Sequence, residues 1–70
     1  MYLVVRVKKE LNEPTYHVVA FCYKVNEDGT AIKKKVREQY AYPYAIARDY
    51  ARNLRNMIDC REYFKESVRG

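Results

Sequence analysis

The feature that most constrains the fold is a tight turn at residues 26–29 (Asn-Glu-Asp-Gly), set between two runs of strand-forming residues. Gly29 has no Cβ and accepts the positive φ that a tight hairpin turn demands. The run before the turn, residues 16–25, is apolar on both parities, which predicts a central strand. The run after it, residues 30–41, predicts an antiparallel neighbour.

A further strand and a helix complete the pattern. Residues 2–9 are rich in β-branched side chains that alternate with charged ones, which predicts a first strand ending before Pro14. Pro43 suits the first turn of a helix, and the residues after it place apolar side chains on one face and arginines opposite. We expect the helix to end near residues 58–60, because a continuing helix would carry Arg61 into the apolar face.

These elements predict one α+β domain over residues 1–70, in which a three-stranded antiparallel β-meander packs against one amphipathic helix. Residues 61–69 are compatible with a short fourth strand or with a last helical turn formed by Phe64 and Val68. The strand is the favoured alternative, and it gives the order β-β-β-α-β. A domain of this size buries only about 60% of its unfolded surface, so its core must be efficient or shared.

Positive charge is the main functional signal. The chain has 14 Lys and Arg against nine Asp and Glu, a net charge of +5, which favours polyanionic partners. Residues 31–37 hold four of these cations and no acid. Strand alternation predicts that the cations gather on the sheet face opposite the helix. The predicted binding residues are Arg6, Lys8, Lys24, Lys33, Lys35 and Arg37.

The same alternation predicts which apolar residues accompany the cations. We expect Val18, Ala20 and Cys22 of the central strand on this face, beneath a rim of cations. Lys34 falls in phase with core residues of its own strand, and an edge position or a bulge would accommodate it. A solvated sheet face, or a face covered by another chain, is the alternative to a binding surface.

Two smaller surface features also suggest binding. The first is a secondary basic stripe on the helix, formed by Arg48, Arg52 and Arg55. The second is an aromatic interface at the junction of strand and helix, formed by Tyr40, Tyr42 and Tyr44. An ordinary solvated helix face and a well-packed junction are the respective alternatives.

Residues for chemistry are scarce, so we expect no enzyme, no cofactor and no metal site. His17 and Ser67 are single residues with no partner indicated by spacing, and the two glycines cannot form a phosphate loop. Cys22 and Cys60 form no Cys-x-x-Cys pair, and we expect reduced, buried thiols. The chain start shows neither a signal peptide nor a membrane span, so we expect a cytoplasmic protein without membrane contact.

Residues 16–51 resemble two nucleic-acid modules. The hairpin turning at residues 28–29, the basic return strand and the helix with Ala47 and Ala51 are similar to the arm-site DNA-binding domain of tyrosine integrases and to the second half of double-stranded-RNA-binding domains. The chain departs from the first module where Pro43 follows Tyr42, and from the second because it lacks a leading helix and a Lys-Lys pair opening the last helix. Its size, tyrosine content and charge are also similar to small phage-encoded proteins that bind host factors.

The sequence therefore predicts a small basic binding protein, without catalysis, that holds DNA or RNA on a cationic sheet face. The alternative is a protein-binding inhibitor or adaptor of phage type that antagonises a host nuclease or defence complex. Its cations would then bind an acidic or nucleic-acid-binding surface of that partner protein. A housekeeping structural domain or a homodimer is a third alternative. All three stay open on the sequence alone.

Overall fold

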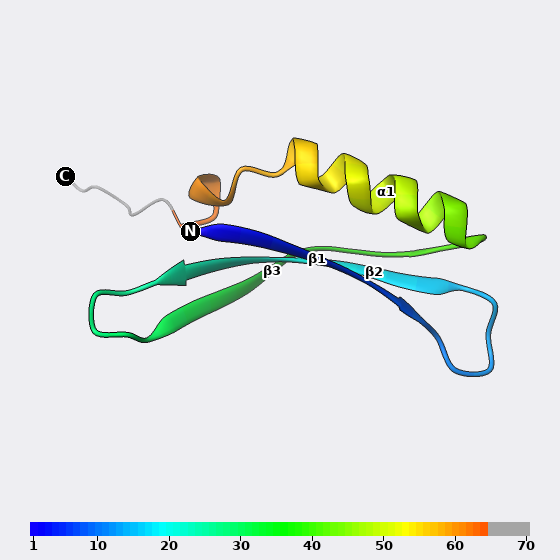
Figure 1. Cartoon of the computed structure of the whole chain (residues 1–70), viewed down its shortest axis with the longest axis horizontal. Coiled ribbons are helices and arrows are strands. Elements are labelled where there is room, and N and C mark those ends of the chain that lie inside the picture. The colour runs from blue at the N-terminus through cyan, green and yellow to red at the C-terminus, as the bar shows by residue number, and fades with distance from the viewer. Residues whose placement is uncertain (65–70) are drawn as a thin grey trace.

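The computed structural model describes residues 1–64. The chain forms three strands, β1 (Tyr2–Lys9), β2 (Tyr16–Val25) and β3 (Ala31–Ala41), followed by helix α1 (Tyr44–Met57) and a short 3-10 helix, η1 (Cys60–Glu62). The strands make one antiparallel sheet in the order β1-β2-β3, and α1 lies across one face of it (Figure 1). The predicted α+β meander with one helix is confirmed.

The β2–β3 turn is built as the sequence predicts. Gly29 has a φ of 92°, and the backbone N–H of Asn26 donates to the carbonyl oxygen of Thr30 over 2.7 Å. The Asp28 carboxylate accepts hydrogen bonds from the hydroxyl and the backbone N–H of Thr30, at 2.7 and 3.0 Å. These bonds lower the pKa of Asp28, because they favour its ionised form. The turn is thereby fixed by its own side chains.

The main core lies between α1 and the sheet. Its buried residues are Val18, Ala20, Ala47, Ala51 and Leu54. Partly buried side chains of β1 pack against this cluster, namely Leu3, Val5 and Val7. The alanines at 47 and 51 lie one turn apart on α1, and because they carry only a methyl group they let the helix approach β2 closely.

The prediction that the small residues of β2 lie on the sheet face opposite the helix is wrong. Val18, Ala20 and Cys22 are completely buried, and the first two belong to the core beneath α1. They pair with residues of β1 that also face α1, so they lie on the helix side of the sheet. Because side chains alternate along a strand, the larger Phe21 and Tyr23 lie on the opposite side. Small residues of β2 meet small residues of α1, and this fit decides the facing.

A β-bulge in β3 places Arg37 on the other side of the sheet from the one predicted. Phe21 pairs with Lys35 but Ala20 pairs with Arg37, so Val36 is an extra residue at this point. Arg37 therefore lies on the helix side with Ala20, where it lines a hollow beside Met57. The prediction that Arg37 shares a face with Lys35 is wrong, because the bulge reverses the alternation beyond it.

Lys34 and Lys24 also lie on the helix side. Lys34 pairs with Cys22 on the edge strand β3, its Nζ donates to the carbonyl oxygen of Tyr63 over 2.8 Å, and it lies 5.1 Å from the ring centre of Phe64. Lys24 follows Cys22 by two residues and so has the same facing. The prediction that Lys24 belongs to the surface opposite the helix is therefore wrong, for the same reason that the facing of β2 is wrong.

The chain leaves the regular helix at Met57. Ile58 is extended, and its N–H donates to Leu54 as the last helical bond. Arg61 stays out of the core, since its guanidinium makes two bonds of 3.0 and 3.1 Å to the Asp59 carboxylate. Of the predicted fourth strand at residues 61–69, residues 61–62 are in a 3-10 helix and residues 63–64 are not in a strand, whereas residues 65–69 lie outside the described residues.

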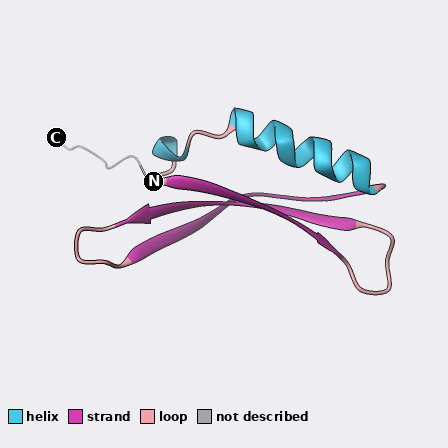
Figure 2. Cartoon of the chain, viewed as in Figure 1, coloured by secondary structure: helices cyan, strands magenta, loops and turns pink. Residues whose placement is uncertain are grey.

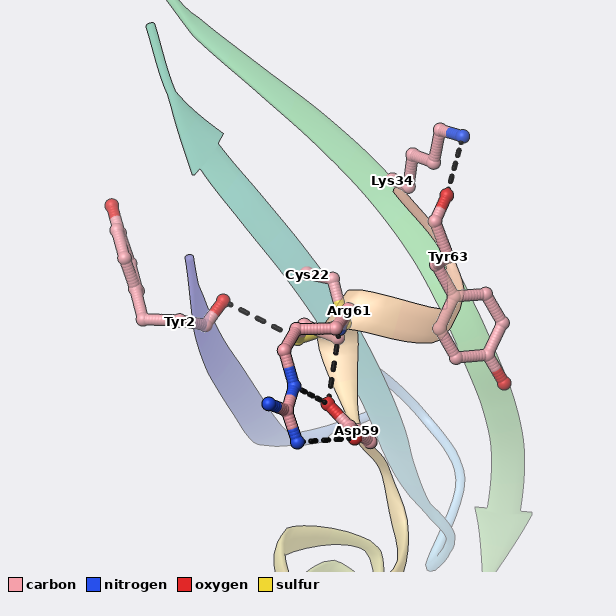
Figure 3. Close-up of a disulfide and its surroundings, with 7 residues drawn as sticks. Tyr2, Cys22, Lys34, Asp59, Arg61 and Tyr63 are labelled. Carbon is pink, nitrogen blue, oxygen red and sulfur yellow. Dashed lines mark hydrogen bonds and ion pairs between the residues drawn. A yellow bond between two sulfur atoms is a disulfide. The ribbon is translucent and has the colours of Figure 1, made fainter. Parts of the chain in front are cut away.

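Cys22 and Cys60 are joined by a disulfide, with their Cα atoms 5.4 Å apart (Figure 3). The expectation of two reduced thiols is therefore wrong. The turn after α1 brings Cys60 onto the sheet, where its sulfur lies 3.5 Å from the carbonyl oxygen of Tyr2. Both cysteines and Phe64 form a second buried cluster beside the main core. Disulfides persist mainly in oxidising compartments, so the bond gives no support to the predicted cytoplasmic location.

Within residues 1–64, no helix is both long enough and apolar enough to cross a membrane.

Candidate functional site

The sheet face opposite α1 is not covered by any helix or strand of residues 1–64 (Figure 2). Strand register and alternation arrange its side chains in four rows across β1, β2 and β3. We call this surface the open face. Its rows are Tyr2-Tyr23-Lys33, Val4-Phe21-Lys35, Arg6-Val19-Glu38 and Lys8-His17-Tyr40.

Four of the predicted binding residues meet on the open face. The edge strands β1 and β3 contribute two exposed cations each, and these are Arg6, Lys8, Lys33 and Lys35. Glu38 is the one carboxylate in the four rows. The open face is therefore positively charged along both edges, with β2 between them.

Glu38 is held by two neighbours on the open face. It accepts a hydrogen bond from Lys35 Nζ over 2.9 Å, and its other oxygen lies 2.6 Å from Nε2 of His17. The bond from Lys35, and then that to His17, lower the pKa of Glu38. The carboxylate thus stays ionised and offsets Lys35, so the unbalanced positive charge lies at Arg6, Lys8 and Lys33.

Aromatic rings occupy the two end rows. Tyr2 and Tyr23 stack with ring centres 5.0 Å apart and planes only 5° from parallel, while His17 and Tyr40 stack at 4.5 Å and 12°. In the row beside the first pair, Phe21 lies under Lys33, whose Nζ is 4.5 Å from the ring centre. The open face thus carries five aromatic rings and four cations, together with Val4, Val19 and Glu38, whereas small apolar residues of β2 were predicted there.

The ring partners on β2 are functional candidates that were not predicted from the sequence. His17, Phe21 and Tyr23 were not among the predicted binding residues, because β2 was expected to face the other way. A signal was nevertheless present. The small Ala20 matches the alanines of α1, with which it shares the main core, and that match assigns the larger side chains of β2 to the uncovered side.

The predicted arginine stripe lies apart from the open face. Arg48, Arg52 and Arg55 are exposed, and each directly follows a buried residue of α1 in the chain. One residue rotates the side chain by about 100° around a helix, so the stripe runs along a flank of α1 rather than its outermost face. It therefore lies on the helix side of the molecule, away from the four cations of the open face.

The predicted tyrosine cluster is divided by the structure. Tyr40 belongs to the open face, whereas Tyr44 packs edge-on against Tyr16 with ring centres 5.2 Å apart. Tyr42 is 62% exposed and lines, together with Tyr40, Ile46 and Tyr50, a hollow of about 400 Å³. Tyr40 and Tyr42 thus border one hollow, whereas Tyr44 is not among its lining residues.

Residues 1–64 contain no group of three or more His, Cys, Asp or Glu that could hold a metal ion. The open face instead presents ammonium and guanidinium donors beside aromatic rings.

Comparison with protein-family models, with curated proteins and with solved structures finds no match to this chain.

Proposed function

We propose that the protein is a non-catalytic nucleic-acid-binding protein that holds DNA or RNA on the open face. One observation carries the proposal: four exposed cations of β1 and β3 share a sheet face that no other described element covers. Phosphate groups would lie over the two cationic edges, with the bases or a groove over β2 between them. Such contacts release the counterions that condense on a nucleic acid.

The proposal predicts a strong dependence on salt. Three unbalanced cations, with a fourth offset by Glu38, should give a plot of log affinity against log salt concentration with a slope of about −3 for duplex DNA and about −2 for a single strand. We would measure this slope by fluorescence anisotropy with labelled DNA and RNA. Absence of binding at low salt would contradict the proposal.

Charge removal on β1 locates the interface. In the variant Arg6→Gln/Lys8→Gln we expect weaker binding and a slope that is less steep by about two. The variant Arg48→Gln/Arg52→Gln removes the same charge from the flank of α1 and should lose less affinity. An equal loss in both variants would show that net charge, and not the open face, governs binding.

A second candidate function is supported by the hollow near Tyr42. Ile46 is 52% exposed beside it, so the hollow is an apolar surface that a protein partner could cover. This observation favours the protein-binding inhibitor or adaptor, for which a host nuclease or defence complex was the predicted target. The test is a pull-down after nuclease treatment: a partner that is retained, and then lost on Ile46→Ser but not on Lys33→Gln, supports this candidate.

The predicted homodimer stays a prediction. Its test is the mass of the protein by light scattering at high concentration, where a monomeric mass would exclude it.

A further inference from the structure

We infer that the nucleic acid bound by the open face is single-stranded, with unstacked bases placed against Tyr2 and Tyr40. The inference rests on the proposed function and specifies its ligand. The observation behind it is the stacking of Tyr2 on Tyr23 in the first row of the open face and of Tyr40 on His17 in the last row. Tyr2 and Tyr40 lie on opposite edge strands of the sheet.

The first stacking position is the outer side of Tyr2. The ring of Tyr2 lies parallel to that of Tyr23 on the central strand, and Tyr2 belongs to the edge strand β1, beyond which the sheet has no further strand. The side chain is 51% exposed and extends away from the disulfide (Figure 3). A base on the outer side of Tyr2 would continue a stack that the protein has already begun.

The second stacking position repeats this arrangement at the other edge. Tyr40 belongs to the edge strand β3, is 52% exposed and stacks on His17 of the central strand. The bond between His17 and Glu38 fixes the imidazole that supports the tyrosine. Both tyrosines are thus held in place before a ligand arrives, which lowers the conformational cost of binding.

The four cations lie on either side of the diagonal that joins the two tyrosines. Lys33 shares a row with Tyr2, Lys8 shares a row with Tyr40, and the remaining two cations lie in the rows between. The first and last rows are six residues apart along β1, which corresponds to about 20 Å. A strand of a few nucleotides can cross the open face diagonally, with a base at each end and phosphates over the cations.

The rings favour a single strand over a duplex. In a duplex, neighbouring bases already cover both faces of every base except those at its two ends, so an exposed tyrosine has no base face to stack on along its length. In a single strand every base offers such a face, and stacking on an aromatic side chain tolerates any sequence. A face made only of cations would not distinguish the two ligands.

The test compares ligands and side chains together. The full chain is titrated at low salt with an oligothymidylate of about 12 nucleotides, an oligouridylate of the same length and a DNA duplex of matched length. We expect both single strands to bind more tightly than the duplex. Tyr2→Leu and Tyr40→Leu should each weaken single-strand binding about tenfold, whereas Tyr2→Phe and Tyr40→Phe, which keep the ring, should bind nearly as wild type.

Tyr63→Leu serves as the matched control, because Tyr63 is a partly exposed tyrosine outside the open face. Circular dichroism confirms that each variant is folded. The inference is overturned if the duplex binds as tightly as the single strands and the leucine variants bind as wild type; if Lys33→Gln still weakens binding in that case, the proposed function survives. If neither single strand nor duplex binds, both proposals fail.

Discussion

The two faces of the same three strands differ in how their side chains are used. On the helix side, small and branched apolar residues are buried beneath α1, and a disulfide ties η1 to β2. On the open face, aromatic rings stack in pairs at the surface and alternate with cations. β2 is therefore apolar on both sides for different reasons. On the helix side its apolar residues pack in the core, and on the open face its aromatic rings form part of the surface.

The helix side should dominate stability. Leu54 is 1% exposed at the centre of the core, and Leu54→Ala should lower the free energy of unfolding by about 3 kcal/mol, because it leaves a cavity. Val25 is the last residue of β2; its side chain lies on the same side of the sheet as the open face and is exposed. Val25→Ala should therefore change the free energy of unfolding by less than about 0.5 kcal/mol. Urea unfolding measures both, and equal losses would contradict the assignment of the core.

The disulfide should have an effect of similar size. Its two cysteines are 38 residues apart, and a cross-link over such a loop restricts the unfolded chain. The variant Cys22→Ala/Cys60→Ala should lose about 3 kcal/mol of unfolding free energy, and a reducing agent should bring the wild type to a similar level. A wild type whose stability does not respond to the reducing agent would show that the bond contributes nothing.

The pH dependence of the open face should be the smallest effect. Hydrogen bonds from Lys35 and His17 hold the pKa of Glu38 below its usual value of 4.5, so the folded state favours the carboxylate. The stabilisation is therefore present above about pH 4.5 and is lost as the pH falls through the lowered pKa. An NMR titration of Glu38 should give a midpoint below 4.5 that rises in Lys35→Gln. A midpoint unchanged by this substitution would contradict the pairing.

The elements could be predicted from the sequence because each has a local cause. Gly29 supplies the turn, Pro43 precedes the first helical residue, and the apolar spacing around Leu54 sets the buried face of α1. The placement of the edge cations on β1 follows from simple alternation, since Leu3 and Arg6 have opposite parity.

The remaining features depend on contacts between distant segments. Alternation cannot orient β2, because both of its faces are apolar, and it fails for Arg37, because the bulge at Val36 adds a residue. No spacing pattern links Cys22 to Cys60, whose approach depends on the path of the chain after α1. The aromatic residues of the candidate site were not predicted because alternation could not show which side of β2 faces the helix.

The most direct test of the binding face uses four cations of β3. Lys33→Gln/Lys35→Gln removes two charges from the open face, and Lys34→Gln/Arg37→Gln removes two charges from the helix side of the same strand. Affinity for an oligothymidylate should fall about tenfold or more in the first variant and change much less in the second, because only the first pair faces the ligand. Equal losses in the two variants, or a larger loss in the second, would contradict the claim that the open face binds nucleic acid.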